Sequence, residues 1–226
     1  MTLDKLIYDV RESLREYVDD SNVDNRYIQY LINNKRAKLL GQDLNRQNTI
    51  IDEGMKQTFC LNLQRVNALE CGVDMGCKYV YRTERAIPEP MDLKNKPAIT
   101  RVSSVNIIDK PFTMTNRERA VYQSQSAFNT IPAVFYHTDK YLYLIGDESA
   151  LKLLKKINIT GVFENPLELI DYTMESGEAC YDVGSFDYPI APRHIDIVIQ
   201  EVTKQIAGSK MMPVDDTNNG KEDGNK

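Results

Sequence analysis

The sequence has too few cysteines and too short apolar runs to belong to several common protein classes. Its four cysteines in 226 residues are too sparse for a disulfide scaffold, the framework on which small secreted domains depend. No apolar run approaches the ~18 residues that identify a bilayer-spanning helix. The opening MTLDKLIYDV places aspartates where a signal peptide needs an unbroken apolar segment. We therefore expect a chain made in a cytosol, with reduced thiols and no membrane partner.

Basic charge is also scarce, because 28 lysines and arginines face 33 aspartates and glutamates for a net charge of −5. Proteins that coat duplex DNA obtain their affinity from cations that neutralise phosphates, so this balance argues against that class. A local exception is segment 78–120, where cations alternate with aromatic residues. Such a pattern suits a small regulatory module or one that binds single-stranded nucleic acid by stacking. It equally suits the rim of a protein interface, where Tyr and Arg are enriched. We favour the interface, because the chain as a whole is acidic.

Motifs for nucleotide, metal or catalytic chemistry are missing or incomplete. No glycine-rich loop that would cradle phosphates occurs. Cys60, Cys71, Cys77 and His137 offer zinc-ligating atoms, but the two nearest cysteines are spaced more widely than in common zinc knuckles. The two histidines, His137 and His194, have no serine or cysteine partner in a recognisable motif, although a small hydrolase stays open as an alternative. We predict no catalytic residue, no metal and no cofactor.

Helical periodicity dominates the first 45 residues. Apolar residues recur at spacings of three and four from Leu3 to Val18, which is the pattern of one apolar stripe on a helix. A second helix begins near Asp24, and Gly41 lies where a left-handed C-terminal cap belongs. The short polar break between the two predicts an antiparallel helical hairpin. The first helix is rich in acidic residues and the second in basic residues, so the two attract.

The middle of the chain changes to the two-residue alternation of half-buried strands. Its strongest signal is IPAVFYH, a turn and KYLYLIG, whose aromatic and β-branched residues predict a hairpin over 131–146. Further strands are predicted over 78–84, 99–108 and 155–163. A short helix is expected over 166–174.

A last amphipathic helix over 192–207 begins with Pro192 and closes with Gly208. Because its apolar stripe must be buried, we expect it to pack on the first two helices. The residues after Met212 are too polar to offset their ordering entropy alone. The sequence thus predicts an α+β protein in which a small helical bundle carries an inserted β-rich domain. The predicted divisions are a helical hairpin over 1–45, a β-rich insertion over 46–190, a C-terminal helix over 191–208 and a polar tail over 209–226.

The order of these elements resembles a known family. The hairpin segment DDSNVDNRYIQYLINNKRAKLL, the β-rich middle, the late helix in YPIAPRHIDIVIQEVTKQIAG and the polar tail are together similar to head-to-tail connector proteins of tailed bacteriophages. Within that group of adaptor and ring proteins, the chain is most similar to the ring proteins of crAss-like phages with short tails. The resemblance covers residues 1 to about 208 and is one of architecture, without a diagnostic motif.

The resemblance implies a non-enzymatic virion protein, assembled in the host cytoplasm, that forms a closed, twelvefold ring below the portal protein. Such a ring extends the DNA channel and docks the next tail or ring protein, while DNA passes through the lumen without specific binding. At −5 per copy, twelve copies carry about −60, which would repel DNA phosphates. Ring closure needs head-to-tail contacts, for which we expect the two hairpin helices and the strands of 131–146. The candidate interface residues are Tyr27, Arg36, Tyr79, Tyr81, Arg82, Phe135, Tyr136, Tyr141 and Tyr143.

Overall fold

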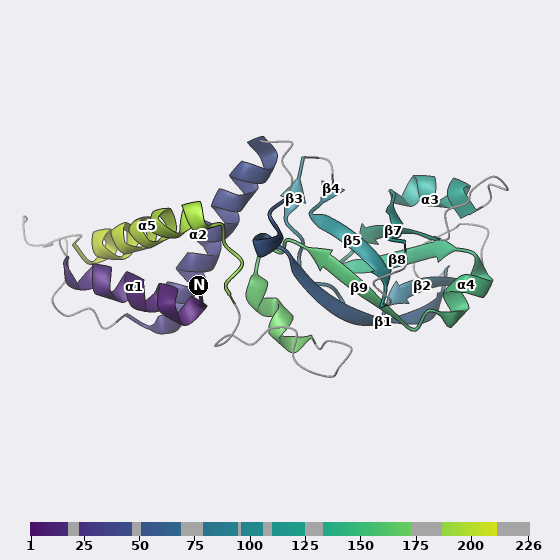
Figure 1. Cartoon of the computed structure of the whole chain (residues 1–226), viewed down its shortest axis with the longest axis horizontal. Helices are drawn as coiled ribbons and strands as arrows, with labels where there is room; N and C mark the ends of the chain where they lie inside the picture. The colour runs from purple at the N-terminus through teal and green to yellow at the C-terminus, as the bar shows by residue number, and fades with distance from the viewer. Residues whose placement is uncertain are drawn as a thin grey trace, which may run out of the picture.

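Helices gather at one end of an elongated molecule, and a curved β-sheet occupies the other end (Figure 1). Helix α2, Asn25–Arg46, runs obliquely from the helical end toward the sheet and connects the two. The structure is a computed structural model that describes residues 1–17, 23–46, 51–68, 79–94, 96–105, 110–124, 133–172 and 187–211.

Three helices share the core of the helical end. Helix α1, Leu3–Arg15, starts behind Thr2, whose hydroxyl accepts a hydrogen bond from the Lys5 N–H at 3.4 Å. Helix α5, Pro192–Met211, packs against both α1 and α2. Pro192 suits the first helical turn, where its missing N–H needs no partner. The core residues contributed by the three helices are Leu3, Leu6, Ile7, Val10, Leu14, Ile28, Leu31, Ile32, Val198, Val202 and Ile206.

Two predicted helix ends are wrong, because the glycines expected to close the helices lie inside them. Both α2 and α5 run on past Gly41 and Gly208, respectively. A glycine inside a helix costs about 1 kcal/mol relative to alanine. In α2 that cost is offset by the burial of Leu40 and the packing of Leu44 against the same apolar cluster. Tertiary packing therefore extends α2 beyond the point where its local sequence favours an end.

Seven strands form one sheet in the order β5-β9-β1-β2-β8-β7-β6, and β3 and β4 pair separately. Neighbours in the large sheet are antiparallel, apart from the parallel pair β6 and β7. The strands are β1 Gln57–Asn67, β2 Tyr79–Thr83, β3 Asp92–Leu93, β4 Lys96–Pro97, β5 Ile99–Ser104, β6 Thr113–Met114, β7 Ala133–Thr138, β8 Tyr141–Gly146 and β9 Lys156–Gly161.

Strand β1 belongs to both halves of the sheet. Its first half pairs with β9, with Phe59 opposite Ile159, and its second half pairs with β2. The outermost strands β5 and β6 come near each other, because the Phe112 N–H beside β6 donates a 2.7 Å hydrogen bond to the Val102 carbonyl in β5. The sheet is therefore nearly closed on itself.

Four short helices lie among the described residues, one before β1, two between strands and one after β9. Only the last was predicted from the sequence, as the short helix over 166–174. They are η1 Glu53–Met55, α3 Arg117–Ser124, α4 Glu148–Leu153 and η2 Pro166–Asp171.

The sheet buries apolar side chains on both faces. On the inner face, the Phe59 ring meets Phe163 and Tyr172 edge to face, with centroids 5.4 Å and 5.0 Å away. On the other face, α3 covers a second cluster in which Tyr136 and Tyr143 stack with centroids 5.1 Å apart. A third cluster around Leu40 of α2 joins the helical end to the sheet.

The predicted α+β class is confirmed. The segments predicted as strands over 78–84, 99–108 and 155–163 overlap β2, β5 and β9, and the predicted hairpin over 131–146 contains β7 and β8. Its turn is formed by Asp139 and Lys140, whose φ angles of 49° and 66° are left-handed. Two-residue turns of this kind match the twist of the flanking strands. Residues 78, 106–108 and 131–132 of these predictions lie outside the described part of the chain.

Candidate assembly surfaces

The helical end and the sheet meet at Arg36 of α2, whose side chain is 0% exposed. Its Nε–H donates to the Pro189 carbonyl at 2.6 Å, and its Nη1 donates to the carbonyls of Phe163 and Glu164 at 3.0 Å and 3.3 Å. The guanidinium also lies 5.7 Å from the centroid of the Tyr188 ring. One cation thus holds backbone from the segment after β9 and from the segment before α5.

Polar side chains near Arg36 strengthen this junction. Asn33 of α2 accepts a hydrogen bond from the Tyr188 hydroxyl and donates one to Asn165 Oδ1 at 3.3 Å. Lys35 pairs with Glu201 at 3.1 Å and so joins α2 to α5. Because the Arg36 side chain is enclosed within the chain, its predicted place on a subunit interface is corrected to a structural role inside one copy.

Asp43 of α2 holds the beginning of α5. Its Oδ2 accepts hydrogen bonds from Arg193 Nη2 at 2.5 Å and Nε at 3.2 Å, and it lies 2.9 Å from His194 Nε2. The hydrogen bond from Arg193 lowers the pKa of Asp43, and the charges of Arg193 and His194 act in the same direction against desolvation. His194, the histidine of the alternative hydrolase hypothesis that lies on α5, is buried at the contact between α5 and Asp43 of α2.

Exposed aromatic residues gather on the helices. Tyr8 of α1 and Tyr30 of α2 are 61% and 60% exposed, and Tyr27 is exposed as well. Helical spacing places Tyr27 and Tyr30 on one face of α2 with Asn34 and Lys38, and all four side chains are exposed. These four residues are called the α2 stripe below. Tyrosines that stand out from a surface in this way are typical of protein association sites.

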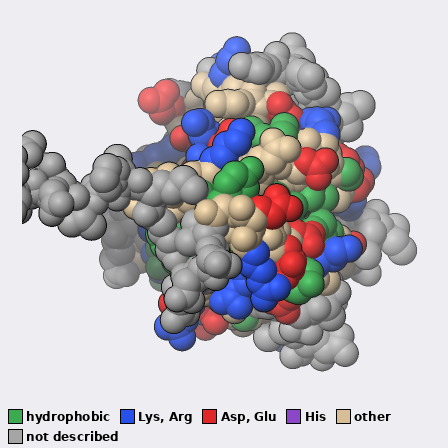
Figure 2. All heavy atoms as spheres, turned by 90° about the vertical axis from the view of Figure 1, so that its left-hand side faces the viewer, with side chains coloured by type: hydrophobic (Ala, Val, Ile, Leu, Met, Phe, Trp, Pro, Cys, Tyr) green, Lys and Arg blue, Asp and Glu red, His purple; other side chains and the backbone are tan. Residues whose placement is uncertain are grey.

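The helical end mixes charge with apolar surface. Figure 2 shows acidic, basic and apolar side chains intermingled on this end of the molecule, without a patch of a single sign. Helix α1 exposes Asp4 together with the cations Lys5, Arg11 and Arg15, and Glu16 is exposed at its C-cap, whereas the α2 stripe carries Lys38 and no carboxylate. The exposed residues of α1 therefore carry charges of both signs, and the α2 stripe carries two tyrosines and one cation.

Arginine side chains stack on tyrosine rings along the β1-β2-β8 part of the sheet. The guanidinium carbon of Arg65 lies 3.9 Å from the centroid of Tyr79, and that of Arg82 lies 4.4 Å from the centroid of Tyr141. Tyr79 is exposed, and Arg82 and Tyr141 are partly exposed. Tyr79, Arg82 and Tyr141 are therefore the predicted interface residues of the sheet whose side chains reach the surface of the chain.

The other predicted interface residues of the sheet are core residues. Tyr81 and Phe135 belong to the inner core, and Tyr136 and Tyr143 stack in the cluster beneath α3. Strands β7 and β8 are paired on both sides, by β6 and by β2. Burial inside one copy therefore accounts for Phe135, Tyr136 and Tyr143, and Tyr141 is the aromatic residue of this hairpin that stays partly exposed among the described residues.

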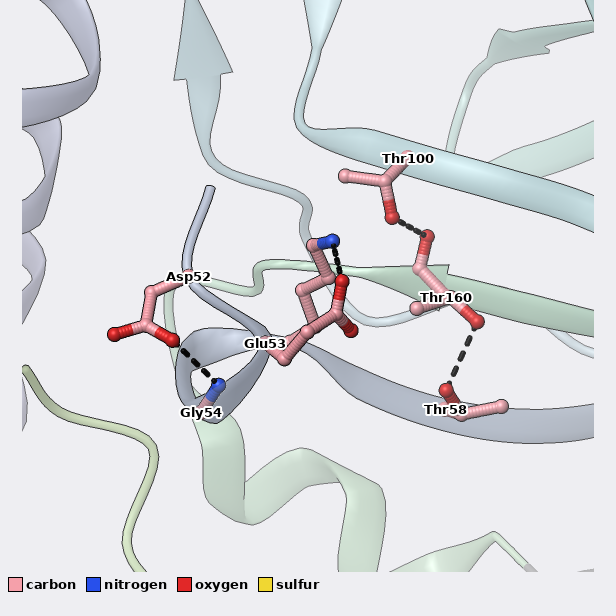
Figure 3. A network of polar contacts seen from close by, with 7 residues as sticks. Asp52, Glu53, Gly54, Thr58, Thr100 and Thr160 are labelled. Atoms are coloured by element: carbon pink, nitrogen blue, oxygen red, sulfur yellow. Dashed lines mark hydrogen bonds and ion pairs between the residues drawn. The ribbon is translucent and has the colours of Figure 1, made fainter. Parts of the chain in front are cut away.

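The outward face of β5, β9 and β1 is polar (Figure 3). Thr58 and Thr160 share a hydrogen bond of 2.8 Å between their hydroxyls, and Thr100 Oγ1 donates to the Thr160 carbonyl at 3.1 Å. Just before β1, Asp52 caps η1 by accepting a hydrogen bond from the Gly54 N–H at 3.2 Å. Cross-strand threonine pairs of this kind contribute about 0.2–1 kcal/mol, so this face stabilises the sheet while remaining suited to water.

A cavity of about 600 Å³ opens where the sheet does not close, between β5 and the edge formed by β6 and β7. Its apolar residues continue the inner core, and its polar residues stand at the rim. The apolar lining is Pro97, Ile99, Phe112, Met114 and Phe135; the polar lining is Lys96, Thr100, Thr115, Asn116, Arg117, Arg119 and His137. Sequence reasoning missed this cavity because segments far apart in the chain form it.

Burial and neighbouring charge account for three further pKa shifts. Desolvation lowers the pKa of His137, although the carboxylates of Glu89, Asp139 and Asp92 oppose it. The imidazole is therefore neutral near pH 7. Burial raises the pKa of Glu164, and nearby carboxylates add to that effect. Burial likewise raises the pKa of Tyr172, although the Arg85 charge opposes it, and its hydroxyl donates to the Ala86 carbonyl at 2.6 Å.

The predicted zinc ligands are only partly covered by the structure. Cys60 donates its thiol hydrogen bond to Asn158 Oδ1 at 2.6 Å, and His137 lines the cavity. Cys71 and Cys77 lie outside the described residues. Within the described ranges, no group of three or more histidine, cysteine, aspartate or glutamate side chains is placed to hold a metal ion.

The helices among the described residues are not long and apolar enough to cross a membrane.

The whole chain matches a family of phage structural proteins. The sequence profile of the phage tail ring protein 2 family, named CrAss_Ring_2, matches residues 5–224. The chain belongs to this family, which confirms the resemblance to ring proteins of crAss-like phages. It is similar to "Ring protein 2" of Bacteroides phage crAss001, with 26% identity over 228 residues that cover 99% of this chain and 98% of that protein. The chain is thus a phage tail ring protein and a structural component of the virion, in a family named for a structural role.

Proposed function

We propose that twelve copies of this chain close into a ring within the head-to-tail connector, below the portal protein. The ring extends the DNA channel and offers a docking surface to the next tail or ring protein, after assembly in the host cytoplasm. Membership of the tail ring protein family is the observation that carries this proposal. The difference between the outer faces of α1 and α2 supports it.

The proposed contact between copies joins the α2 stripe of one copy to the outer face of α1 of the next. Tyr27 and Tyr30 supply apolar area with little conformational freedom to lose. In this contact Lys38 would pair with Asp4 of α1 or with Glu16 at its C-cap, beside the exposed cations Lys5, Arg11 and Arg15 of the same helix. A second proposed contact lies on the sheet, where Arg65 stacks on Tyr79 and Arg82 stacks on Tyr141. Its residues from the predicted interface are Tyr79, Arg82 and Tyr141.

The proposed divisions of the chain follow from these roles. The helical end, comprising residues 1–45 and 191–208, makes the contact between copies. The β-rich insertion, 46–190, faces the neighbouring ring or portal, and the tail, 209–226, reaches another chain. In the structure, α5 extends to Met211, so three residues of that tail are helical.

The net negative charge of the proposed ring determines how it interacts with DNA. Twelve copies at −5 each give an assembly with about −60 formal charges, whose field repels phosphates. In this proposal the lumen exposes acidic residues, so packaged DNA slides past without specific binding.

Particle mass tests the proposal. Purified protein, alone and with purified portal protein, is measured by multi-angle light scattering and imaged by electron microscopy. We expect annular particles whose mass corresponds to twelve copies, formed alone or on the portal. A chain that stays monomeric under both conditions would contradict ring formation, and rings of another copy number would contradict the twelvefold symmetry.

A further inference from the structure

We propose that the cavity between β5 and the β6–β7 edge binds the C-terminal segment 212–226 of a neighbouring copy. The proposal rests on the ring assembly proposed above and identifies a segment that links adjacent copies. It is carried by the lining of the cavity, the composition of the segment and the direction of α5.

The cavity suits a ligand with an apolar part followed by negative charge. Its apolar residues, including Phe112 and Met114, continue the inner core, while Lys96 and Arg119 stand exposed at the rim. The described residues that line it include no aspartate or glutamate. His137 Nε2 is buried at this cavity without a hydrogen-bond partner among the described residues. A neutral imidazole there is ready for a polar partner brought by a ligand.

The C-terminal segment has the matching order of residues. It opens with Met212, Pro213 and Val214 and continues with Asp215 and Asp216. The apolar residues fit the apolar part of the cavity, and the two carboxylates can accept charge-assisted hydrogen bonds from the cationic rim.

The direction of α5 makes the ligand a segment of another copy. Figure 1 shows α5 running away from the sheet, with its last residues at the far end of the molecule. Its 20 residues make a helix about 30 Å long. Residues 212–216 span at most about 18 Å when fully extended. They are too short to run back along α5 to the cavity of their own chain, which lies beyond the start of that helix.

Each copy in a ring would place its own C-terminal segment in the cavity of one neighbour and bind the C-terminal segment of the other neighbour. Such reciprocal contacts raise the strength of the whole assembly, because each segment is held near its site at a high effective concentration. They place the sheet end of the receiving copy beside the helical end of the copy that supplies the segment, and they do not use the α2 stripe.

Photo-crosslinking of the full chain tests this proposal. The variant Thr217→p-benzoylphenylalanine places a crosslinker next to Asp216. Heavy-nitrogen-labelled and unlabelled copies are mixed, irradiated and digested, and the products are identified by mass spectrometry. We expect crosslinks of mixed isotope composition from the segment to peptides containing cavity residues in 96–100, 112–119 or 135–137.

Variants of the rim supply the controls. Lys96→Glu and Arg119→Glu should each lower the yield of mixed crosslinks at least about tenfold, since the rim then repels carboxylates. Lys152→Glu, an exposed lysine on α4 outside the cavity lining, should leave the yield unchanged. An excess of synthetic peptide 212–226 should compete, whereas the peptide with Asp215→Asn and Asp216→Asn should compete poorly. Circular dichroism verifies that every variant is folded.

The outcomes separate this proposal from ring formation. Crosslinks confined to one isotope, crosslinks outside the cavity, or none would overturn the proposed docking of the segment. Light scattering on the same samples reports the ring independently. Closed particles without cavity crosslinks would refute the segment contact alone, whereas mixed cavity crosslinks in small open particles would support the segment contact and refute the closed ring.

Discussion

Arg36 Nη1 donates a 3.0 Å hydrogen bond to the Phe163 carbonyl, and this contact ties the helical end of the molecule to the segment that follows β9. The same guanidinium also holds the Pro189 carbonyl before α5. A buried cation whose donors meet backbone carbonyls is costly to remove, since those carbonyls then lose partners that water cannot replace.

Replacing Arg36 should therefore destabilise the fold. Arg36→Met keeps an unbranched side chain but leaves buried carbonyls without donors, so we expect the free energy of unfolding to fall by about 2–4 kcal/mol. Chemical denaturation measures the change. Lys38→Met, at an exposed position of the same helix, should change stability by less than about 0.5 kcal/mol. Equal stabilities for the two variants would contradict the role given to Arg36.

The α2 stripe should control assembly without controlling folding. Because Tyr27 and Tyr30 are exposed in one copy, Tyr27→Ala combined with Tyr30→Ala should leave the fold of each copy, measured by circular dichroism, unchanged. We expect the same variant to shift particles toward monomers in sedimentation velocity, since exposed aromatic residues dominate many interfaces. Leu153→Ala, at an 83% exposed position on α4, serves as a control that should leave particle size unchanged. Intact rings from the double variant would exclude this contact.

The Asp43 cluster should make stability depend on acid. The pKa of Asp43 is lowered mainly by the hydrogen bond from Arg193, so its stabilisation is present above the unfolded pKa of about 3.9 and is lost as pH falls through the lower folded value. Asp43→Asn should lower stability by about 1 kcal/mol at pH 7. Denaturation curves across pH should show that the difference from the unmodified protein begins to shrink below about pH 4 and disappears below the folded pKa of Asp43. Asp196→Asn, exposed on α5, should leave the pH profile unaltered.

Two glycines should respond in opposite directions to alanine. A Cβ at Gly161 in β9 would lie 2.9 Å from the Ala98 carbonyl oxygen, closer than side-chain carbons normally approach. Gly161→Ala should therefore lower stability by about 1–3 kcal/mol. Gly208 lies inside α5 with open space around its Cβ position, so Gly208→Ala should raise stability by about 0.5–1 kcal/mol. Thermal melts give the comparison: a rise in stability for Gly161→Ala would refute the close approach at β9, and a fall for Gly208→Ala would refute the gain expected in α5.

The sequence allowed the main elements to be predicted where their periodicity is long. The stripe from Leu3 to Leu14 repeats over several turns and matches α1. The aromatic and β-branched runs of β7 and β8 match a hairpin, because such residues pack well in strands. Gly41 misled the prediction of a helix end, since local propensity favours a stop and the apolar cluster around Leu40 overrides it.

The surfaces were harder to predict than the elements. Tyr136 and Tyr30 are the same residue type, yet one is 1% exposed and the other 60%. Composition alone cannot separate them, because aromatic residues serve both cores and interfaces. Arg36 is likewise buried by contacts with residues more than 100 positions away. Once the boundaries of α2 are known, the helical spacing from its buried residues places Tyr30 on the outer face of the helix.

The anchoring of α2 by Arg36 has a mechanical consequence for a ring. Around a closed circle of identical copies, any looseness between the two ends of each molecule accumulates from one copy to the next. A flexible junction between the helical end and the sheet would allow rings of several copy numbers, whereas a rigid junction would allow one. Arg36 binds the backbone on both sides of the junction, so in the proposed ring it would hold the two ends of every copy at one angle and favour a single ring size.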